Sequence, residues 1–325
     1  MKFLIAGAGA IGAYVGACLH RAGEDVTLFA RGPHLRAMQA NGVRVLSIEG
    51  DFEVCPKIIE KLEDAGPVDV MILGVKAHSL TQLAPQLKPL VSANTTVVST
   101  ENGIPWWYFQ LGAGEFTGLR LERVDPGGVI GQSFDPHRVV GSIVYLATEI
   151  AEPGVIRHIE GNRISLGEPD GSKSERIRLI ANALIKAGLK APVTTHFRNE
   201  IWVKILGNVA FNPISALTRA TLAQIARDPE TRAVVRNIMT EVAAVASKLG
   251  VDMPITIEQR IAGAEKVGEH KTSMLQDLEL GRPLELEAVV GAVLEIGERL
   301  RVPRPNTQAV YVCTRRLEKT LIKAR

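Results

Sequence analysis

The chain has 325 residues and a formal net charge of +3, and 46% of its residues are hydrophobic. A chain of this length and apolar content can bury a substantial core, and its length predicts two domains. The net charge is small, and no run of lysine or arginine alternates with aromatic residues. These features exclude nucleic acid as the main partner.

The cysteines and the apolar segments bear on the cellular compartment. Cys18, Cys55 and Cys313 lie far apart in the sequence, so we expect no disulfide framework. The uncharged stretch from the residue after Lys2 to Leu19 resembles a signal peptide in length, but its four glycines do not suit an exported apolar segment. No other segment is long and apolar enough to span a bilayer. We therefore expect a cytoplasmic protein without a membrane partner.

A glycine-rich turn follows the first predicted strand. The apolar run 2–6 predicts this strand, and Gly7-Ala8-Gly9-Ala10-Ile11-Gly12 leads from it into a helix expected from Ile11 to Ala22. In such a GxGxxG pattern the first glycine permits the tight turn, the second lets a pyrophosphate approach the backbone, and the third lets the helix pack on the strand. The helix N-terminus offers N–H groups to the phosphates. The pattern predicts dinucleotide binding.

The second strand is expected at 25–29, and the residues after it indicate which of the two nicotinamide dinucleotides binds. An acidic side chain there would bind the ribose 2′-hydroxyl of NAD and repel the 2′-phosphate of NADP. The chain instead has Ala30 and Arg31, and a guanidinium suits a phosphate. We predict NADP (NADPH) as the cofactor. The alternative interpretation is that Arg31 is only a solvated charge at a strand end.

The rest of the first half predicts an α/β domain of the doubly wound Rossmann type. Two continuous apolar runs, 68–75 and 95–99, are typical of parallel strands covered on both faces. Because ligands bind at the carboxyl ends of such strands, we expect Lys76 and Asn102 to lie near the cofactor. The other expected elements are a helix at 33–41, a hairpin at 43–54 turning at 49–51, β-hairpins at 138–167 turning at 153–154 and 160–162, and a helix at 174–187.

The second half has the pattern of long amphipathic helices, which predicts an all-helical domain. We place the two domains at residues 1–195 and 196–325. The helices are expected at 199–211, 229–249, 254–267, 284–299 and 306–323.

Four polar residues recur every four positions in the first of these helices. Glu200, Lys204, Asn208 and Asn212 therefore share one face, while most of the other residues around them are apolar. A helix that is apolar around most of its circumference is buried, so this polar stripe does not simply face water. It is either a site or a structural set, in which Glu200 pairs with Lys204 and the asparagines bind neighbouring backbone.

Ordered motifs run along nearly the whole chain: the glycine turn, Val75-Lys76-Ala77, Asn102-Gly103, Trp202-Val203-Lys204, Asn208, Phe211-Asn212-Pro213, residues 272–277 and Leu284-Glu285. Together they resemble the motifs of the ketopantoate reductase (2-dehydropantoate 2-reductase) family. The resemblance implies a Rossmann domain followed by a helical domain. It also implies NADPH-dependent reduction of 2-dehydropantoate to pantoate in pantothenate biosynthesis.

The resemblance implies catalytic roles for three residues. Lys204 would donate a proton to the ketone oxygen, where negative charge develops as hydride arrives. Asn102 would hydrogen-bond the same oxygen and also lie near the cofactor. Glu285 would hold the nicotinamide end of the cofactor or assist Lys204.

The resemblance also implies binding roles. Asn208 and Asn212 would bind the distal hydroxyl of the substrate, and Ser273 would hold its carboxylate. Lys76 would contact the cofactor, and Ala147 would lie behind the nicotinamide.

Simpler interpretations of three of these residues stay open. Ser273 suits a helix N-cap paired with Gln276, Glu285 suits an acid in the first turn of a helix, and Lys76 suits a solvated lysine. We expect no metal, because the histidines show no metal-ligand spacing. We expect His78, His158, His196 and His270 on the surface or in loops.

Two departures from the family pattern affect positions that we expect to recognise the substrate. The segment that begins Pro105-Trp106-Trp107-Tyr108 looks longer than in compact members, and His270 and Leu222 stand where members can carry polar contacts. One alternative function is therefore action on another 2-oxo or 2-hydroxy acid, branched or aromatic, with the three aromatic residues lining its pocket. Another alternative is a non-catalytic NADP-binding sensor. We also predict a homodimer through the helical domain.

Overall fold

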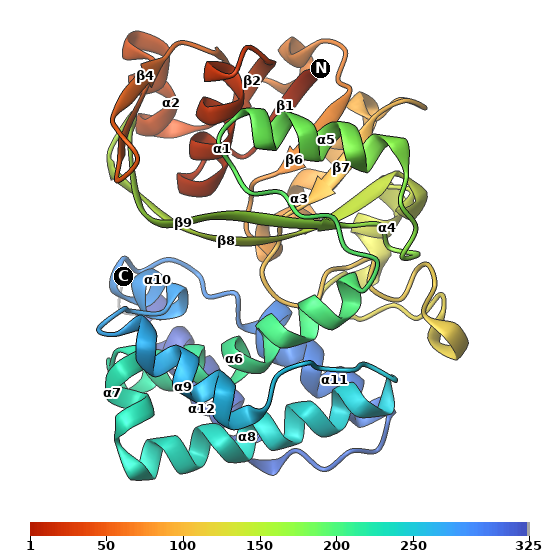
Figure 1. Ribbon diagram of the computed structural model, residues 1–325, viewed down its shortest axis with the longest axis vertical. Helices are drawn as coiled ribbons and strands as arrows, with labels where there is room; N and C mark the ends of the chain where they lie inside the picture. The colour runs from red at the N-terminus through yellow and green to blue at the C-terminus, as the bar shows by residue number, and fades with distance from the viewer. Residues whose placement is uncertain (324–325) are drawn as a thin grey trace. The chain divides into compact units, whose positions relative to one another are not determined.

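The computed structural model describes residues 1–323 and divides into two compact units, which we describe separately (Figure 1). The first unit comprises 1–101, 106–120 and 127–197, and the second comprises 102–105, 121–126 and 198–325. Two short loop segments from the first half of the chain thus belong to the second unit. One of these segments begins with Asn102.

The first unit is built on one twisted sheet. Within the described residues the strand order is β4-β3-β9-β8-β7-β6-β1-β2-β5. Strand β1 pairs in parallel with β2 on one side and with β6 on the other. This divergence is a topological switch point, the place where open α/β sheets bind ligands. The strands are β1 Lys2–Ala6, β2 Asp25–Phe29, β3 Val43–Ser47, β4 Phe52–Val54, β5 Lys57–Ile59, β6 Val70–Leu73, β7 Thr96–Ser99, β8 Val139–Glu152 and β9 Val155–Gly167.

Helices cover the sheet and close its core. Helix α1 packs against β2, β8, β9 and α5, and its buried face joins one large apolar cluster with the strands. Every residue of β6 and of β7 is buried, which explains why these strands were predicted from continuous apolar runs. The helices of the unit are α1 Ala10–Arg21, α2 Gly32–Asn41, α3 Ala77–Leu87, α4 Val129–Ser133 and α5 Glu175–Lys186.

Strands β8 and β9 form one long hairpin, which corrects the predicted second turn at 160–162. The chain reverses at Pro153-Gly154, whereas Gly161 lies within β9, where the register shifts opposite Tyr145 and Ala147. Gly161 has a φ of 72°, so it accommodates an extra residue in the strand as a bulge. Strand β5 was also not predicted, because three residues are too short for a periodic signal.

His158 is buried rather than on the surface or in a loop, so that prediction was wrong. It lies in β9, and its ring stacks on that of Tyr14 with centroids 4.5 Å apart. Its Nδ1 lies 3.1 Å from the Tyr14 hydroxyl and 2.9 Å from the Ser47 hydroxyl. These polar partners offset the cost of burying an imidazole.

The second unit is helical, and the predicted fold class is confirmed. Helix α6 continues past Pro213, although we expected it to end at residue 211. Phe211, Ile214 and Ala216 are buried, and this burial outweighs the backbone hydrogen bond that proline removes. The helices are α6 Phe197–Thr218, α7 Leu222–Arg227, α8 Pro229–Lys248, α9 Ile257–Val267, α10 Ser273–Glu279, a π-helical turn Glu287–Gly291, α11 Ala292–Arg299 and α12 Pro305–Lys323.

None of the helices within residues 1–323 has both the length and the apolar character needed to cross a membrane.

Candidate active site

The glycine turn lies between β1 and α1, at the carboxyl end of β1. A Cβ atom on Gly7 would clash with Val75, and one on Gly12 would clash with the Gly7 carbonyl. A Cβ on Gly9 would meet nothing within 4 Å. The turn is therefore tightly packed at Gly7 and Gly12 and open at Gly9. Gly9 is also the N-cap of α1, where no side chain binds the first N–H groups. This geometry fits the pyrophosphate of a dinucleotide.

Lys76 and Arg31 lie at the ends of strands next to this turn. Lys76 is the N-cap of α3 and follows Val75, which packs against Gly7. Arg31 is the N-cap of α2, two residues after the end of β2, and its side chain is exposed. Its guanidinium carbon lies 5.3 Å from the ring centroid of Phe29. Both cations therefore stand at the edge of the sheet where β2 and β6 have their carboxyl ends.

Ala147 lies on β8, opposite Glu160 and beside the bulge at Gly161. It is half-buried, and its neighbourhood is the irregular part of the hairpin.

The polar stripe of α6 lies in the second unit. Asn212 is buried, with 5% of its surface exposed, and Lys204 and Asn208 are half-buried. Burial lowers the pKa of Lys204 from 10.5 to about 8, although the Glu285 carboxylate acts in the opposite direction. The carboxylate that acts electrostatically on Lys204 is therefore Glu285, from a distant part of the sequence.

Asn102 and Asn208 are in direct contact. Asn208 donates a hydrogen bond from Nδ2 to Oδ1 of Asn102, at 2.8 Å. The residues after Asn102 are held by the π-helical turn, because the Ile104 N–H donates to the Ala288 carbonyl at 3.0 Å. Between them Gly103 has a φ of 106°, and a Cβ there would clash with the same carbonyl. These contacts fix the backbone directly after Asn102.

Ser273 and Glu285 occupy helix starts, and the structure contradicts the simpler interpretation for Ser273. The N-cap of α10 is Thr272, whose Oγ1 accepts from the Leu275 N–H at 3.3 Å, and Ser273 is exposed in the first turn. The interpretation of Ser273 as the cap was therefore wrong. Glu285 precedes the π-helical turn, and its carbonyl accepts from the Val289 N–H.

The aromatic residues Trp106, Trp107 and Tyr108 belong to the core of the first unit. Each is at most 4% exposed. Trp107 stacks on Phe197 and donates from Nε1 to the Ser99 hydroxyl at 2.8 Å. Their burial assigns them to packing and not to the wall of an open pocket.

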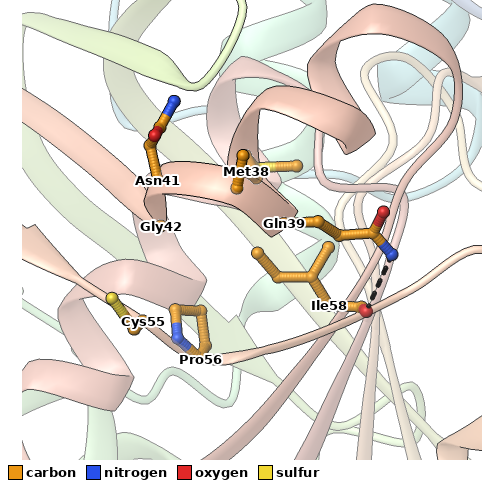
Figure 2. A pocket seen from close by; sticks show the side chains of 8 residues that line it. Met38, Gln39, Asn41, Gly42, Cys55, Pro56 and Ile58 are labelled. Carbon is orange, nitrogen blue, oxygen red and sulfur yellow. Dashed lines mark hydrogen bonds between the residues drawn. The ribbon is translucent and has the colours of Figure 1, made fainter.

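A surface pocket in the first unit contains none of the predicted site residues (Figure 2). It lies between the end of α2 and the start of β5, where Gln39 donates to the Ile58 carbonyl at 3.4 Å. Helix α2 begins beside Arg31 and runs about 15 Å away from it. The pocket is therefore at the opposite edge from the glycine turn.

Comparisons with known proteins agree with these observations. The family model "Ketopantoate reductase PanE/ApbA" matches residues 3–171, and "Ketopantoate reductase PanE/ApbA C terminal" matches residues 196–318. A 2-dehydropantoate 2-reductase of Mesorhizobium japonicum is 52% identical over 319 residues, which cover 98% of each chain.

Solved structures share the fold over the full length. A protein of Ralstonia solanacearum MolK2, solved as a candidate ketopantoate reductase, has 37% identity and a TM-score of 0.94 over 98% of both chains. A D-mandelate dehydrogenase with NADH and anilino(oxo)acetate has a TM-score of 0.85 over 99% of both chains. Its identity of 22% establishes the shared fold alone. On the family models and the identity to its relatives, the chain belongs to the ketopantoate reductase family.

Proposed function

We propose that this protein reduces 2-dehydropantoate to pantoate with NADPH, a step in pantothenate biosynthesis. The family and the name of its 52% identical relative support this activity. The observation that carries it is the second unit's polar site, where Lys204, with a lowered pKa, stands on the same helical stripe as Asn208, which donates a hydrogen bond to Asn102. A non-catalytic sensor would have no need of a proton donor of this kind.

NADPH, when bound, supplies the hydride that adds to the C2 carbonyl of the substrate. The family is NAD(P)H-dependent, and we assign the NADP preference to Arg31, whose exposed guanidinium suits the 2′-phosphate. The open backbone at Gly9 would receive the pyrophosphate. Lys76 and Asn102, at strand ends, and Ala147, in β8, would contact the cofactor.

Lys204 would protonate the ketone oxygen as negative charge develops there. A pKa of about 8 leaves the ammonium mostly protonated at pH 7, yet acidic enough to give up its proton. Glu285 keeps this pKa from falling further, so it would preserve the charged donor at neutral pH.

Asn102 would hydrogen-bond the same oxygen. The Oδ1 atom of Asn102 accepts a hydrogen bond from Asn208, so the Nδ2 group of Asn102 points away from Asn208 and is available as the donor to the substrate. Asn208 and the buried Asn212 would bind the distal hydroxyl of the substrate, and Ser273 would hold the carboxylate. The buried position of Trp106, Trp107 and Tyr108 disfavours an aromatic acid as the substrate.

Steady-state turnover with a panel of 2-oxo acids and both cofactors tests the proposal. We expect 2-oxo-3,3-dimethylbutyrate, which lacks the hydroxyl, to have a kcat/KM at least tenfold lower than 2-dehydropantoate, because buried amides would stay unpaired. Asn212→Ala should reduce this discrimination. A preference for the hydroxyl-free acid or for an aryl 2-oxo acid would refute the assigned substrate.

A further inference from the structure

The π-helical turn Glu287–Gly291 lies immediately after Glu285 and leads into α11. Its wide winding is visible in the hydrogen bond from the Ala292 N–H to the Glu287 carbonyl, five residues earlier. Such a turn has poorer geometry than an α-helix, so tertiary contacts must hold it. If it relaxed to an α-helix, the residues before it would rotate by about 100° around the axis relative to α11. The turn therefore determines where Glu285 points.

A cluster of three side chains holds the first residue of this turn. The Glu287 carboxylate accepts from the Tyr311 hydroxyl at 2.7 Å and from Arg123 Nη1 at 2.9 Å. Arg123 Nη1 also donates to the Tyr311 oxygen, which closes the triangle. Tyr311 is 2% exposed, and its ring also faces the guanidinium of Arg315 at 6.0 Å. We call Glu287, Arg123 and Tyr311 the clamp.

The backbone of Arg123 is fixed independently of its side chain. The Glu295 carboxylate on α11 accepts from the backbone N–H groups of Glu122 and Arg123, at 3.0 and 2.9 Å. Arg123 is thus attached to the same helical segment at two places. Its side chain binds Glu287, about one turn before the start of α11, and its backbone N–H binds Glu295, about one turn after that start. A solvent-exposed ion pair alone contributes little, but this one is anchored by backbone contacts and a buried phenol.

The other side of the turn faces the candidate active site. Its Ala288 carbonyl accepts from the Ile104 N–H, two residues after Asn102. Glu285 lies directly before Leu286, the N-cap of the turn, and its carboxylate acts to raise the pKa of Lys204. One local backbone distortion therefore connects the clamp with Asn102, proposed to bind the ketone oxygen, and with Glu285, proposed to act on Lys204.

We propose that Glu287, held by Arg123 and Tyr311, is a positioning residue that maintains the π-helical turn and thereby the placement of Glu285 and Asn102. The catalytic consequence of this inference rests on the proposed function. The clamp itself touches neither substrate nor cofactor in this assignment. It acts through the turn.

Gly291 offers a variant that disturbs the clamp without harming the helix. A Cβ atom there would lie 2.5 Å from Glu287 Oε2 and 3.5 Å from Arg123 Cδ. The clashing atom is the end of a flexible side chain, so Gly291→Ala would push the carboxylate away while alanine favours the helix. Gly263→Ala in α9 is the matched control, because its Cβ would meet nothing within 4 Å.

The experiment compares Gly291→Ala and Tyr311→Phe with Gly263→Ala and the wild type in two measurements. The first is kcat, KM for NADPH and the pH profile of kcat. We expect kcat to fall about tenfold or more in both clamp variants, with the KM for NADPH within about twofold of the wild type. The alkaline limb of the profile should move to lower pH, because Lys204 loses the influence of Glu285.

The second measurement does not need turnover. The Lys204 side chain is titrated by NMR in protein labelled with ¹³C at lysine Cε, with its signal assigned by its loss in Lys204→Arg. We expect a lower Lys204 pKa in the two clamp variants than in Gly263→Ala. Unchanged titration and unchanged kcat in both clamp variants would overturn the inference. A wild type without turnover would instead refute the proposed function, while the titration would still decide the role of the clamp.

Discussion

Asn208 Nδ2 and Asn102 Oδ1 are joined by a hydrogen bond of 2.8 Å between residues 106 positions apart in the sequence. One residue comes from the long helix α6, and the other from the loop after β7. The bond orients the Asn102 amide, because an oxygen that accepts from Asn208 leaves the NH₂ group to point elsewhere. The donor function proposed for Asn102 therefore depends on Asn208.

Asn208→Ala tests this dependence. Loss of the bond would free the Asn102 amide to rotate, so we expect kcat for 2-dehydropantoate to fall by about ten- to a hundredfold. The control is Asn199→Ala, at the start of the same helix and outside the stripe. Equal kcat values for the two variants would show that the asparagine pair has no role in the reaction.

The pH dependence of kcat/KM should report Lys204. The general acid must be protonated, so kcat/KM, which reports the free enzyme, should be constant well below pH 8, reach half of its maximum near pH 8 and fall further above it, as the Lys204 pKa of about 8 requires. Lys204→Ala should lower kcat by about two to four powers of ten and leave the affinity for NADPH near that of the wild type. If kcat survives and only thermal stability falls, Lys204 has a structural role.

Lys204 should also lower the free energy of unfolding of the protein at neutral pH. Its pKa is lower in the folded chain than in the unfolded one, so the unfolded chain binds more protons between about pH 8 and 10.5. The free energy of unfolding therefore rises with pH in this window and is lowest below it. We expect Lys204→Met to be more stable than the wild type by at most about 3 kcal/mol at pH 7, with the difference shrinking towards pH 10.5. Urea denaturation at several pH values measures this, and a pH-independent difference would contradict the buried-ammonium assignment.

Arg31→Ala should discriminate between the cofactors. A charge-assisted contact to a phosphate contributes roughly 1.5 to 3 kcal/mol, so the KM for NADPH should rise by about one to two powers of ten. The KM for NADH should hardly change, because NADH lacks the 2′-phosphate. Arg36→Ala, an exposed arginine on the same helix α2, is the control. Equal effects of Arg31→Ala on both cofactors would remove the basis for the NADP assignment.

The glycine turn predicts opposite outcomes for two alanine substitutions. Gly9→Ala adds a methyl group in open space, so the fold should lose less than about 1 kcal/mol while the KM for NADPH rises at least tenfold. Gly12→Ala places the methyl group against the Gly7 carbonyl, so it should lower the stability of the apoprotein by about 1 to 3 kcal/mol. Thermal unfolding and cofactor titration of both variants separate the two roles. A Gly9→Ala protein that binds NADPH normally would contradict the proposed pyrophosphate site.

Several features follow from the sequence by itself, because local patterns encode them. The GxGxxG turn after an apolar strand predicted the β1–α1 unit, and the polar stripe at four-residue spacing identified Lys204, Asn208 and Asn212 on one helical face. Amphipathic periodicity predicted the helical second half. Each of these signals lies within about twenty residues, where the covalent chain itself determines the spacing of side chains.

Only the tertiary structure decided the relationships between distant segments. The Asn102–Asn208 bond, the action of Glu285 on Lys204 and the burial of His158 depend on packing between elements far apart in the chain. The bulge at Gly161 stands where a turn was predicted, and the π-helical turn at Glu287–Gly291 interrupts a predicted regular helix, since long-range contacts there outweigh local preference. Local propensities contribute less than 1 kcal/mol per residue for most residues, whereas tertiary burial and hydrogen bonding at these positions contribute more, and they decide the geometry of the site.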